Sequence, residues 1–260
     1  MLFDPLQAVS QDHWLETELG RYIFSRQEKL ITDLLRPAAG ESVLDVGCGS
    51  GNYLNLFAQK KCSLTGIDPS DAALASARNK LGHRCELVRG SAVDLPFSDN
   101  EFDVVTLINN LRTLDDPQKI IAEAVRVSRN RVFIGFFNKR SFVGTRQSVR
   151  KLFGFPVTSG VRFFTVGEMQ SIIGKSMPSP SITWGSAIYL PGPVYTFFSE
   201  LEELFPMKKN PLGVFVGMVF AVNYTYRTVQ SPILNSFDVE AKTSTAAPEA
   251  IRGMLQEGDR

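Results

Sequence analysis

The sequence predicts an α/β fold, in which a Rossmann-like sheet of seven mostly parallel strands has helices on both faces. From residue 42 to residue 136, short apolar runs that suit buried strands alternate with segments of helical periodicity. A glycine-rich loop directly after the first run indicates a strand–loop–helix unit of the kind that binds ligands in such sheets. Two later runs, at 182–190 and 214–226, are expected to close one sheet edge as an antiparallel hairpin.

Composition limits the classes of function. The chain has 260 residues, 43% of them hydrophobic, which is enough for one or two domains with a buried core. Its net charge of +1 gives no general attraction to nucleic acid or to a membrane surface. The three cysteines, Cys48, Cys62 and Cys85, lack metal-type spacing, so we expect a reduced, cytoplasmic protein without a metal site. The longest uncharged apolar run, 211–226, is shorter than the ~20 residues of a membrane span.

The glycine loop separates two classes of cofactor. Residues 43–51 read Val-Leu-Asp-Val-Gly-Cys-Gly-Ser-Gly, so the glycines follow a G-x-G-x-G pattern. A dinucleotide-binding turn has the pattern G-x-G-x-x-G, and an acid such as Asp45 beside it would repel a pyrophosphate. Asp45 suits a ligand that carries a cationic group. Glycines also let the backbone pass close to a ligand, with backbone N–H groups beside it.

On these residues the chain resembles the class I S-adenosylmethionine-dependent methyltransferases, whose first motif reads much like 44–51. The stretch 14–22 resembles the N-terminal cap of the ubiquinone/menaquinone-biosynthesis group, also called methyltransferase type 11. The resemblance implies S-adenosyl-L-methionine as cofactor, a small-molecule acceptor, and a seventh strand that is antiparallel and inserted near the sheet edge. It also implies that the cap closes over both ligands, with Tyr22 near the cofactor and Trp14 near the acceptor. The alternative is that both side chains are only core contacts.

The cofactor site is expected at the carboxyl ends of the strands. Gly47, Cys48 and Gly49 form the loop, and Asp68 at the end of the second strand can accept hydrogen bonds from both ribose hydroxyls. Pro69 follows it, is expected to border the cofactor as well, and begins the next helix with Ser70. A purely capping role for Asp68 is the alternative.

Adenine recognition departs from the family pattern. In related proteins an acid commonly stands where Ser91 stands and receives the adenine amino group. The hydroxyl of Ser91 accepts a hydrogen bond more weakly than a carboxylate would. The backbone of Ala92 is expected at the ring edge, while Asp94 is expected to face solvent.

The fourth strand ends at Asn109 and Asn110. Ligands of an open α/β sheet lie outside such strand ends, so these two side chains are expected to face the cofactor's methyl group or the acceptor. The alternative is that they only form a turn. Neither histidine, His13 nor His83, is assigned a catalytic role, and His83 is expected to be exposed.

The remaining elements follow from apolar periodicity and capping residues. A first helix is expected over 12–35, divided at Gly20 because glycine inside a helix costs ~1 kcal/mol. Later helices are expected to start at Ser70 and Asp116, and a third at Thr165, where Glu168 completes a capping box. Strands are expected at 62–68, 86–89, 102–108 and 131–136, with residues 128–130 as the turn before the last of these.

A basic segment follows the fourth helix. Between Ala124 and Gly167 there is no acidic residue, and phenylalanines are interleaved with nine basic residues: Arg126, Arg129, Arg131, Lys139, Arg140, Arg146, Arg150, Lys151 and Arg162. One interpretation is a lid that offers cationic and aromatic contacts, such as Arg146, to the acceptor. The other is a solvated surface held down by its phenylalanines.

The predicted organisation is a helical cap over 1–40, a methyltransferase domain over 41–227 with an acceptor-side insertion at 138–164, and a polar, disordered tail over 228–260. The predicted function is methyl transfer to a small molecule. Two alternatives stay open: a methyltransferase-like protein that binds the cofactor or a partner without catalysis, and a nicotinamide-dependent oxidoreductase.

Overall fold

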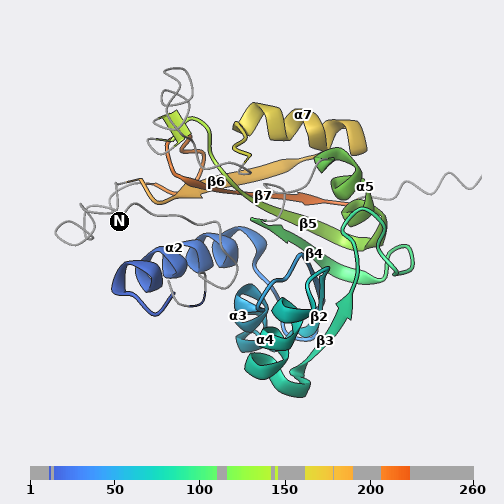
Figure 1. Cartoon of the computed structure of the whole chain (residues 1–260). Coiled ribbons are helices and arrows are strands. Elements are labelled where there is room, and N and C mark those ends of the chain that lie inside the picture. The colour runs from blue at the N-terminus through green and yellow to red at the C-terminus, as the bar shows by residue number, and fades with distance from the viewer. Residues whose placement is uncertain are drawn as a thin grey trace, which may run out of the picture. The chain divides into compact units, whose positions relative to one another are not determined.

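Seven strands form one sheet in the order β3-β2-β1-β4-β5-β7-β6 (Figure 1). This computed structural model describes residues 12, 15–109, 116–141, 144–145, 162–177, 179–189 and 206–222. All of them lie within the compact unit 1–223. The strands are β1 Ser42–Val46, β2 Ser63–Asp68, β3 Cys85–Arg89, β4 Phe102–Ile108, β5 Ser128–Phe137, β6 Ile182–Ala187 and β7 Phe215–Ala221.

The strand directions confirm the expected α/β architecture. β1 pairs in parallel with β2 and with β4, β2 with β3, and β4 with β5. β7 is antiparallel to both of its neighbours, β5 and β6. The last strand is therefore inserted next to the edge strand, as the resemblance implies. The strand order reverses between β1 and β4, and at such a switch point the loops diverge and leave room for a ligand.

Helices cover both faces of the sheet (Figure 1). On one face, α2 (Glu18–Leu35) packs on β6 and β7, α3 (Asn52–Gln59) on β1 and β2, and α4 (Asp71–Leu81) on β2 and β3. On the other face, α5 (Pro117–Val127) packs on β4 and β5 and contacts α7 (Val166–Ser176). A short 3-10 turn, η1 (Gly82–Arg84), joins α4 to β3 and leaves His83 exposed, as expected.

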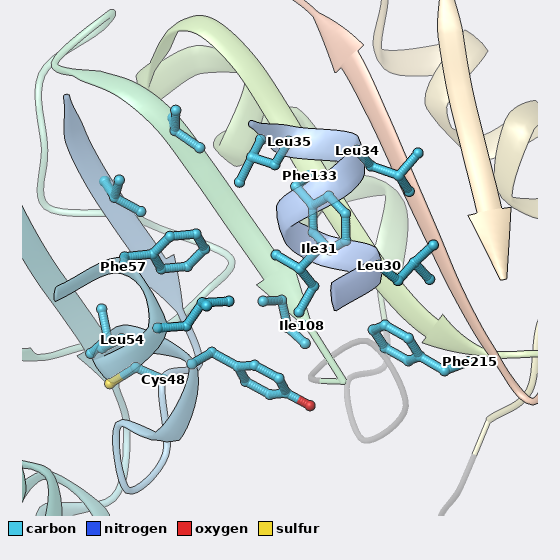
Figure 2. Close-up of a cluster of buried hydrophobic side chains, with 14 of the residues drawn as sticks. Leu30, Ile31, Leu34, Leu35, Cys48, Leu54, Phe57, Ile108, Phe133 and Phe215 are labelled. Carbon is cyan, nitrogen blue, oxygen red and sulfur yellow. The ribbon is translucent and has the colours of Figure 1, made fainter. Parts of the chain in front are cut away.

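Each face has its own apolar core, because strand residues alternate between the two sides. Figure 2 shows the first core, in which Leu30, Ile31 and Leu34 of α2 lie over Phe133 of β5 and Phe215 of β7. The same cluster continues into α3 through Leu54 and Phe57. The second core contains the buried apolar side chains that α5 and α7 turn toward the sheet: Ile120, Ile121, Ala124, Val127, Met169 and Ile173.

The expected break of the first helix at Gly20 is wrong. α2 begins at Glu18, and the N-cap is Thr17, whose hydroxyl oxygen accepts a hydrogen bond from the Gly20 N–H at 3.0 Å. Gly20 therefore stands in the first turn, where its amide is satisfied by the cap instead of by the preceding turn. The chain changes direction before the glycine, at residues 16 and 17.

Residues 128–130 were expected as a turn, and this is also wrong. α5 ends at Val127 and β5 starts directly at Ser128, which pairs with Phe102. The register then shifts by one residue before Arg131 pairs with Val104. A β-bulge of this kind absorbs the extra residue, so the chain passes from helix to strand without a glycine turn.

Three predicted helix caps are confirmed. Ser70 accepts from the Ala73 N–H, and Asp116 accepts from the Lys119 N–H. Thr165 forms the full capping box with Glu168.

Candidate functional site

The carboxyl ends of five neighbouring strands meet at one edge of the sheet. Gly47 follows β1, Asp68 ends β2, Gly90 follows β3, Asn109 follows β4 and Asn138 follows β5. All five strands are parallel, so these residues share the edge at which ligands of open α/β sheets bind. Most of the predicted site residues are among them or beside them.

The glycine loop needs its glycines for two different reasons. Gly47, Gly49 and Gly51 have φ values of 72°, 54° and 79°, a region that other residues rarely adopt. A Cβ on Gly49 would meet nothing within 4 Å, so this position opens onto free space. A Cβ on Gly51 would lie 3.0 Å from Leu81 and 3.2 Å from Ala77, so this position lets α3 pack closely against α4.

Four N–H groups of the loop, those of Gly47, Cys48, Gly49 and Gly51, donate to acceptors within the protein. Gly47 and Cys48 both donate to the carbonyl oxygen of Ile67, at 2.7 and 3.1 Å, and Gly51 donates to the carbonyl of Cys48 at 3.0 Å. Gly49 donates to the Asp68 carboxylate. A pyrophosphate needs such N–H groups as donors, so the loop is poorly suited to a dinucleotide.

Asp68 ties the glycine loop to the start of α4. Its Oδ2 accepts from the Gly49 N–H and its Oδ1 from the Ser70 N–H, both at 2.9 Å. The N-cap of α4 is Ser70 and not Asp68. Each carboxylate oxygen has room for a second hydrogen bond, so Asp68 retains acceptor positions for the two hydroxyls of a ribose.

Asp45 is a buried acid at the centre of the sheet. Its Oδ1 accepts from the hydroxyl of Thr106 on β4 at 2.6 Å. Burial raises the pKa of Asp45 to about 7; the Thr106 hydrogen bond opposes this, and the negative charge of Asp68 adds to it. A cation nearby would favour the ionised form of Asp45. The two acids Asp45 and Asp68 therefore make this region suited to a positively charged ligand group.

Cys48 offers only its backbone to a ligand. Its side chain is buried, and a Cβ on Gly66 of β2 would lie 2.8 Å from the Cys48 sulfur. Burial, followed by the charges of Asp45 and Asp68, raises the pKa of the Cys48 thiol far above its ordinary value. The thiol is therefore an unreactive packing group.

Asn109 is held by a chain of polar side chains. Its backbone has a φ of 59° and its N–H donates to the carbonyl of Gly135 at 2.9 Å. Its Nδ2 donates to the hydroxyl oxygen of Tyr53 at 3.0 Å, and that hydroxyl donates to Oε1 of Gln27 at 2.7 Å. The Asn109 Oδ1 is buried and finds no hydrogen-bond partner among the residues that the structure describes.

Ser91 and Ala92 lie beside Asp68, since the Gly90 N–H donates to the Asp68 carbonyl at 3.3 Å. Ser91 is exposed and its Oγ accepts from the Val93 N–H at 3.4 Å, while Ala92 is buried. Asp94 is exposed, as expected.

Arg126 and Glu123 of α5 hold the loop that follows Ala92. Arg126 donates to the carbonyl oxygens of Leu95 and Phe97 at 2.9 and 2.8 Å, and Glu123 accepts from the Leu95 N–H at 2.9 Å. The loop that follows the third strand is therefore fixed from the face of the sheet that α5 covers.

The predicted cap and acceptor residues are less well placed. Tyr22 lies half-buried on α2 against the first apolar core. Pro69 is exposed between Asp68 and α4. The other three candidates, Trp14, Asn110 and Arg146, lie outside the described residues.

Sequence reasoning missed Asp12. Its Oδ1 accepts from the Ser50 hydroxyl at 2.8 Å, from Asn52 Nδ2 at 3.0 Å and from Lys80 Nζ at 2.5 Å, and its Oδ2 accepts from the Ser76 hydroxyl at 3.3 Å. Burial alone would raise the pKa of Asp12, but the hydrogen bonds, that of Lys80 first, bring it below its usual value. The N-terminal region is thus tied to the glycine loop by partners 38 to 68 residues away, which no local pattern indicates.

Sequence reasoning also missed Gln27 and Tyr53. The available signal was a glutamine within the apolar stripe of the first helix, four residues after Ile23 and four before Ile31. A polar side chain at such a position is buried and must find a partner.

Part of the basic segment is paired with acids from other parts of the chain. Arg126 pairs with Glu123 and Asp99, Arg129 with Asp103, Arg131 with Glu41, and Lys139 with Glu168, while Arg162 lies 5.9 Å from the ring centroid of Phe164. The ends of 138–164 are joined, because Lys139 N–H donates to the Phe164 carbonyl at 2.9 Å and Phe164 N–H to the Phe137 carbonyl at 3.0 Å. Arg146, Arg150 and Lys151 lie outside the described residues.

Among the residues with described positions, no group of three or more His, Cys, Asp or Glu side chains could hold a metal ion. None of the described helices is long and apolar enough to cross a membrane.

Comparison with known sequences finds a family likeness over one part of this unit, from β1 into β5. Residues 44–134, from β1 into β5, match the family described as "Methyltransferase domain" (type 11). Demethylmenaquinone methyltransferase of Listeria welshimeri is 37% identical over 101 residues, which are 36% of this chain and 43% of that protein. Its counterpart from Renibacterium salmoninarum is 33% identical over 108 residues, 40% of this chain and 44% of that protein. Over residues 44–134 the sequence is that of a methyltransferase domain. The match spans less than half the length of these relatives.

Solved structures extend the likeness of this methyltransferase domain over the whole sheet. A possible histamine N-methyltransferase from Thermotoga maritima aligns with a TM-score of 0.65 at 20% identity, over 83% of this chain and 95% of that one. Magnesium protoporphyrin IX methyltransferase from Synechocystis, solved with bound S-adenosylhomocysteine, aligns with a TM-score of 0.59 at 16% identity, over 85% and 97%. At these identities the likeness concerns the fold.

S-adenosylmethionine is the cofactor of this domain, and the residues present fit it. Gly49 faces open space, Asp68 has free acceptor positions, and the two acids Asp45 and Asp68 favour a cation. The unpartnered oxygen of Asn109 is a further acceptor at the same sheet edge.

Proposed function

We propose that the chain transfers the methyl group of S-adenosylmethionine to a small-molecule acceptor. The observation that carries this proposal is the joined arrangement of the glycine loop and Asp68, in which Gly49 opens onto free space while Asp68 fixes the loop. In the proposed site Asp68 receives the ribose hydroxyls, Ser91 and Ala92 border the adenine, and Asp45 faces the positive end of the cofactor or orders the loop around it. The backbone of Gly47, Cys48 and Gly49 borders the ligand, and Tyr22 covers it.

The chemistry asks mainly for positioning. When bound, the cofactor supplies a methyl carbon that its sulfonium activates. The chain's residues then have to hold the acceptor atom in line and close, an effect worth up to ~7–11 kcal/mol in favourable cases. A general base is needed only if the acceptor loses a proton.

We infer that demethylmenaquinone is the first acceptor to test, because the curated relatives carry that name. These relatives match over 101 and 108 residues, and the family match over 44–134 includes the glycine loop and Asp68. The match therefore supports the cofactor site, and demethylmenaquinone is only a candidate acceptor. Trp14, Asn110 and Arg146 stay proposed acceptor contacts.

The cofactor part is tested by titrating S-adenosylhomocysteine and, separately, NAD into the protein in a calorimeter. We expect binding of S-adenosylhomocysteine and none of NAD. Gly49→Ala fills the open space of the loop, whereas Gly40→Ala places a Cβ at another positive φ, 85°, with nothing within 4 Å, at the opposite edge of the sheet. Both variants carry similar backbone strain, and only Gly49→Ala should lose S-adenosylhomocysteine affinity, by tenfold or more. Equal affinities for the two variants would contradict the assigned site.

A second pair of variants tests Asp68. Asp68→Ala removes the acceptor for two ribose hydroxyls, each such bond being worth ~1.5–3 kcal/mol, so S-adenosylhomocysteine affinity should fall at least tenfold. Asp68→Asn keeps one acceptor oxygen and should lose less. Unchanged affinity in Asp68→Ala would place the ribose elsewhere.

One observation favours a second candidate function. The fold of a solved 4+2 cyclase, SpnF, aligns with a TM-score of 0.54 at 20% identity, so a fold of this type is not restricted to methyl transfer. A protein that binds the cofactor without using its methyl group is therefore the main alternative. Incubation with methyl-labelled cofactor and demethylmenaquinone, and then with a cell extract, separates the two. Label in a small molecule supports methyl transfer, and binding without any labelled product supports the alternative.

A further inference from the structure

Three polar side chains join α2 to the cofactor edge of the sheet. Gln27 of α2 is buried and accepts from the hydroxyl of Tyr53, and Tyr53 is the second residue of α3, directly after the glycine loop. The Tyr53 hydroxyl in turn accepts from Nδ2 of Asn109 at the end of β4. The chain of hydrogen bonds therefore ends at the side chain that follows the fourth strand.

The order of donors and acceptors fixes which end of the Asn109 amide faces away from Tyr53. A tyrosine hydroxyl has one proton, and here it points to Oε1 of Gln27, which can only accept. Tyr53 must then accept from Asn109, and only the Nδ2 end of that amide donates. The Oδ1 end is left buried without a partner among the described residues, which is unfavourable until a donor reaches it.

The surroundings indicate the kind of donor that this oxygen would take. Asn109 follows β4, the neighbour of β1 and its glycine loop, and the acids Asp45 and Asp68 lie at the same edge. Two carboxylates disfavour an anionic group there and favour a cationic N–H donor. The cofactor of this domain carries one such group, the ammonium of its methionine part.

We propose that Oδ1 of Asn109 accepts a hydrogen bond from the cofactor's amino group, and that Gln27 and Tyr53 are positioning residues that hold the Asn109 amide with its oxygen facing away from Tyr53. The inference rests on the proposed cofactor site and adds the residues that recognise one functional group of the ligand. Gln27 and Tyr53 act through Asn109.

The test compares two ligands: S-adenosylhomocysteine, and its deaminated counterpart in which hydrogen replaces the amino group. Calorimetry on the full chain gives the ratio of the two affinities. Asn109→Ala removes the acceptor, so S-adenosylhomocysteine should weaken by about ten- to hundredfold while the deaminated ligand binds as before. The ratio of affinities should approach one.

Gln27 gives the sharper test. In Gln27→Met the Tyr53 hydroxyl loses its acceptor and can donate to Asn109, so the amide turns and presents its N–H₂ group to the ligand's ammonium. The ratio should again collapse, although residue 27 is two hydrogen bonds away from Oδ1. Gln27→Glu keeps an acceptor for the hydroxyl and should keep the ratio, even though a buried carboxyl lowers the melting temperature.

The outcomes separate this inference from the proposed function. Failure of the wild-type protein to bind S-adenosylhomocysteine would remove the cofactor site itself. If the wild type binds it but Gln27→Met and Asn109→Ala weaken both ligands equally, the recognition of the amino group is wrong and the three residues are only structural. If the affinity ratio of the two ligands falls to one in Gln27→Glu as well as in Gln27→Met, the Tyr53 hydrogen bond to residue 27 does not set the orientation of the Asn109 amide, and that part of the proposal is wrong.

Discussion

Asp45 and Asp68 end up in different environments although both are acids near the ends of neighbouring strands. Asp68 is half-buried and each of its oxygens accepts a backbone N–H, so its side chain also shapes the loop. Asp45 is buried with one hydroxyl donor, and its pKa rises to about 7. A group kept in so unfavourable a place lowers the stability of the ligand-free protein, which is typical of a residue that serves a ligand.

The raised pKa of Asp45 predicts a pH-dependent stability. Between about pH 4 and pH 7 the folded protein holds a proton on Asp45 that the unfolded chain releases, so this stabilisation is lost as pH rises through 7. Asp45→Asn cannot ionise and keeps an acceptor for Thr106. Urea unfolding should show that the free energy of unfolding of Asp45→Asn, relative to wild type, improves from pH 5 to pH 8 by on the order of 1–4 kcal/mol.

Asp103 provides the matched control for this experiment. Hydrogen bonds from Ser42 and the charge of Arg129 lower the pKa of Asp103, so its contribution to stability is lost only as pH falls below about 4. Asp103→Asn should differ from wild type by the same amount at pH 5 and pH 8. A pH-independent difference for Asp45→Asn as well would show that Asp45 is ionised throughout.

Cofactor affinity should also depend on pH through Asp45. If the ionised carboxyl faces the cationic end of the ligand, binding favours the deprotonated form, and S-adenosylhomocysteine affinity should rise up to about tenfold from pH 6 to pH 8. The rise should be absent in Asp45→Asn. A wild-type affinity that stays constant over this range would leave Asp45 with a loop-ordering role only.

At the scale of elements, the glycine loop connects the ligand edge to the packing of two helices. Gly49 and Gly51 stand two residues apart, yet the first faces open space and the second faces α4. The same short loop therefore leaves room for the cofactor and lets α3 approach Ala77 and Leu81. A substitution in this loop acts on ligand binding or on stability according to which side it faces.

Gly51→Ala is predicted to be a stability variant. It combines a φ of 79° with a Cβ contact of 3.0 Å to Leu81, so it should cost more than the about 1–3 kcal/mol of a strained backbone alone. Gly40→Ala has the positive φ without any contact and supplies the comparison. Urea unfolding of both variants measures the difference, and an equal loss of stability would mean that α4 shifts to accept the methyl group.

At the scale of the whole molecule, charge balance is reached between distant parts of the chain. The basic residues that follow Ala124 find their acids at Glu41, Asp99, Asp103 and Glu168, on both sides of the segment in sequence. The Lys139–Glu168 pair is exposed and contributes little to stability, whereas the side chains of Arg131 and Glu41 are only 23% and 18% exposed. The pairs neutralise the charges of Arg126, Arg129, Arg131 and Lys139, so these four basic residues do not indicate a site for an anionic partner.

The lid interpretation of 138–164 is tested by neutralising Arg146 and Arg150 together. If they border the acceptor, the KM for an anionic or polar acceptor should rise while S-adenosylhomocysteine affinity stays constant, and the effect should shrink at high salt because exposed charges are screened over ~8–10 Å. Arg129→Gln, which removes an exposed pair with Asp103, is the control and should leave KM unchanged. Wild-type behaviour of the double variant at every salt concentration would assign these arginines to the solvated surface.

The sequence by itself determined the strand–loop–helix order, the glycine loop, Asp68 at a strand end and the caps at Ser70, Asp116 and Thr165. These features depend on residues within a few positions of one another, so periodicity and capping chemistry report them; the fourth strand was placed at its observed limits, Phe102–Ile108. The errors at Gly20 and at Ser128 are also local, and both arise because hydrogen bonds to a cap or to a neighbouring strand outweigh intrinsic propensity.

Only the tertiary structure decided what the functional side chains do. It joined Asp12 to Lys80, and Gln27 through Tyr53 to Asn109, across separations of 26 to 68 residues. It also showed that four N–H groups of the glycine loop donate within the protein and that burial raises the pKa of Asp45 to about 7. Burial and hydrogen-bond partners are set by which segments the sheet brings together, and a one-dimensional pattern of residues does not carry that information.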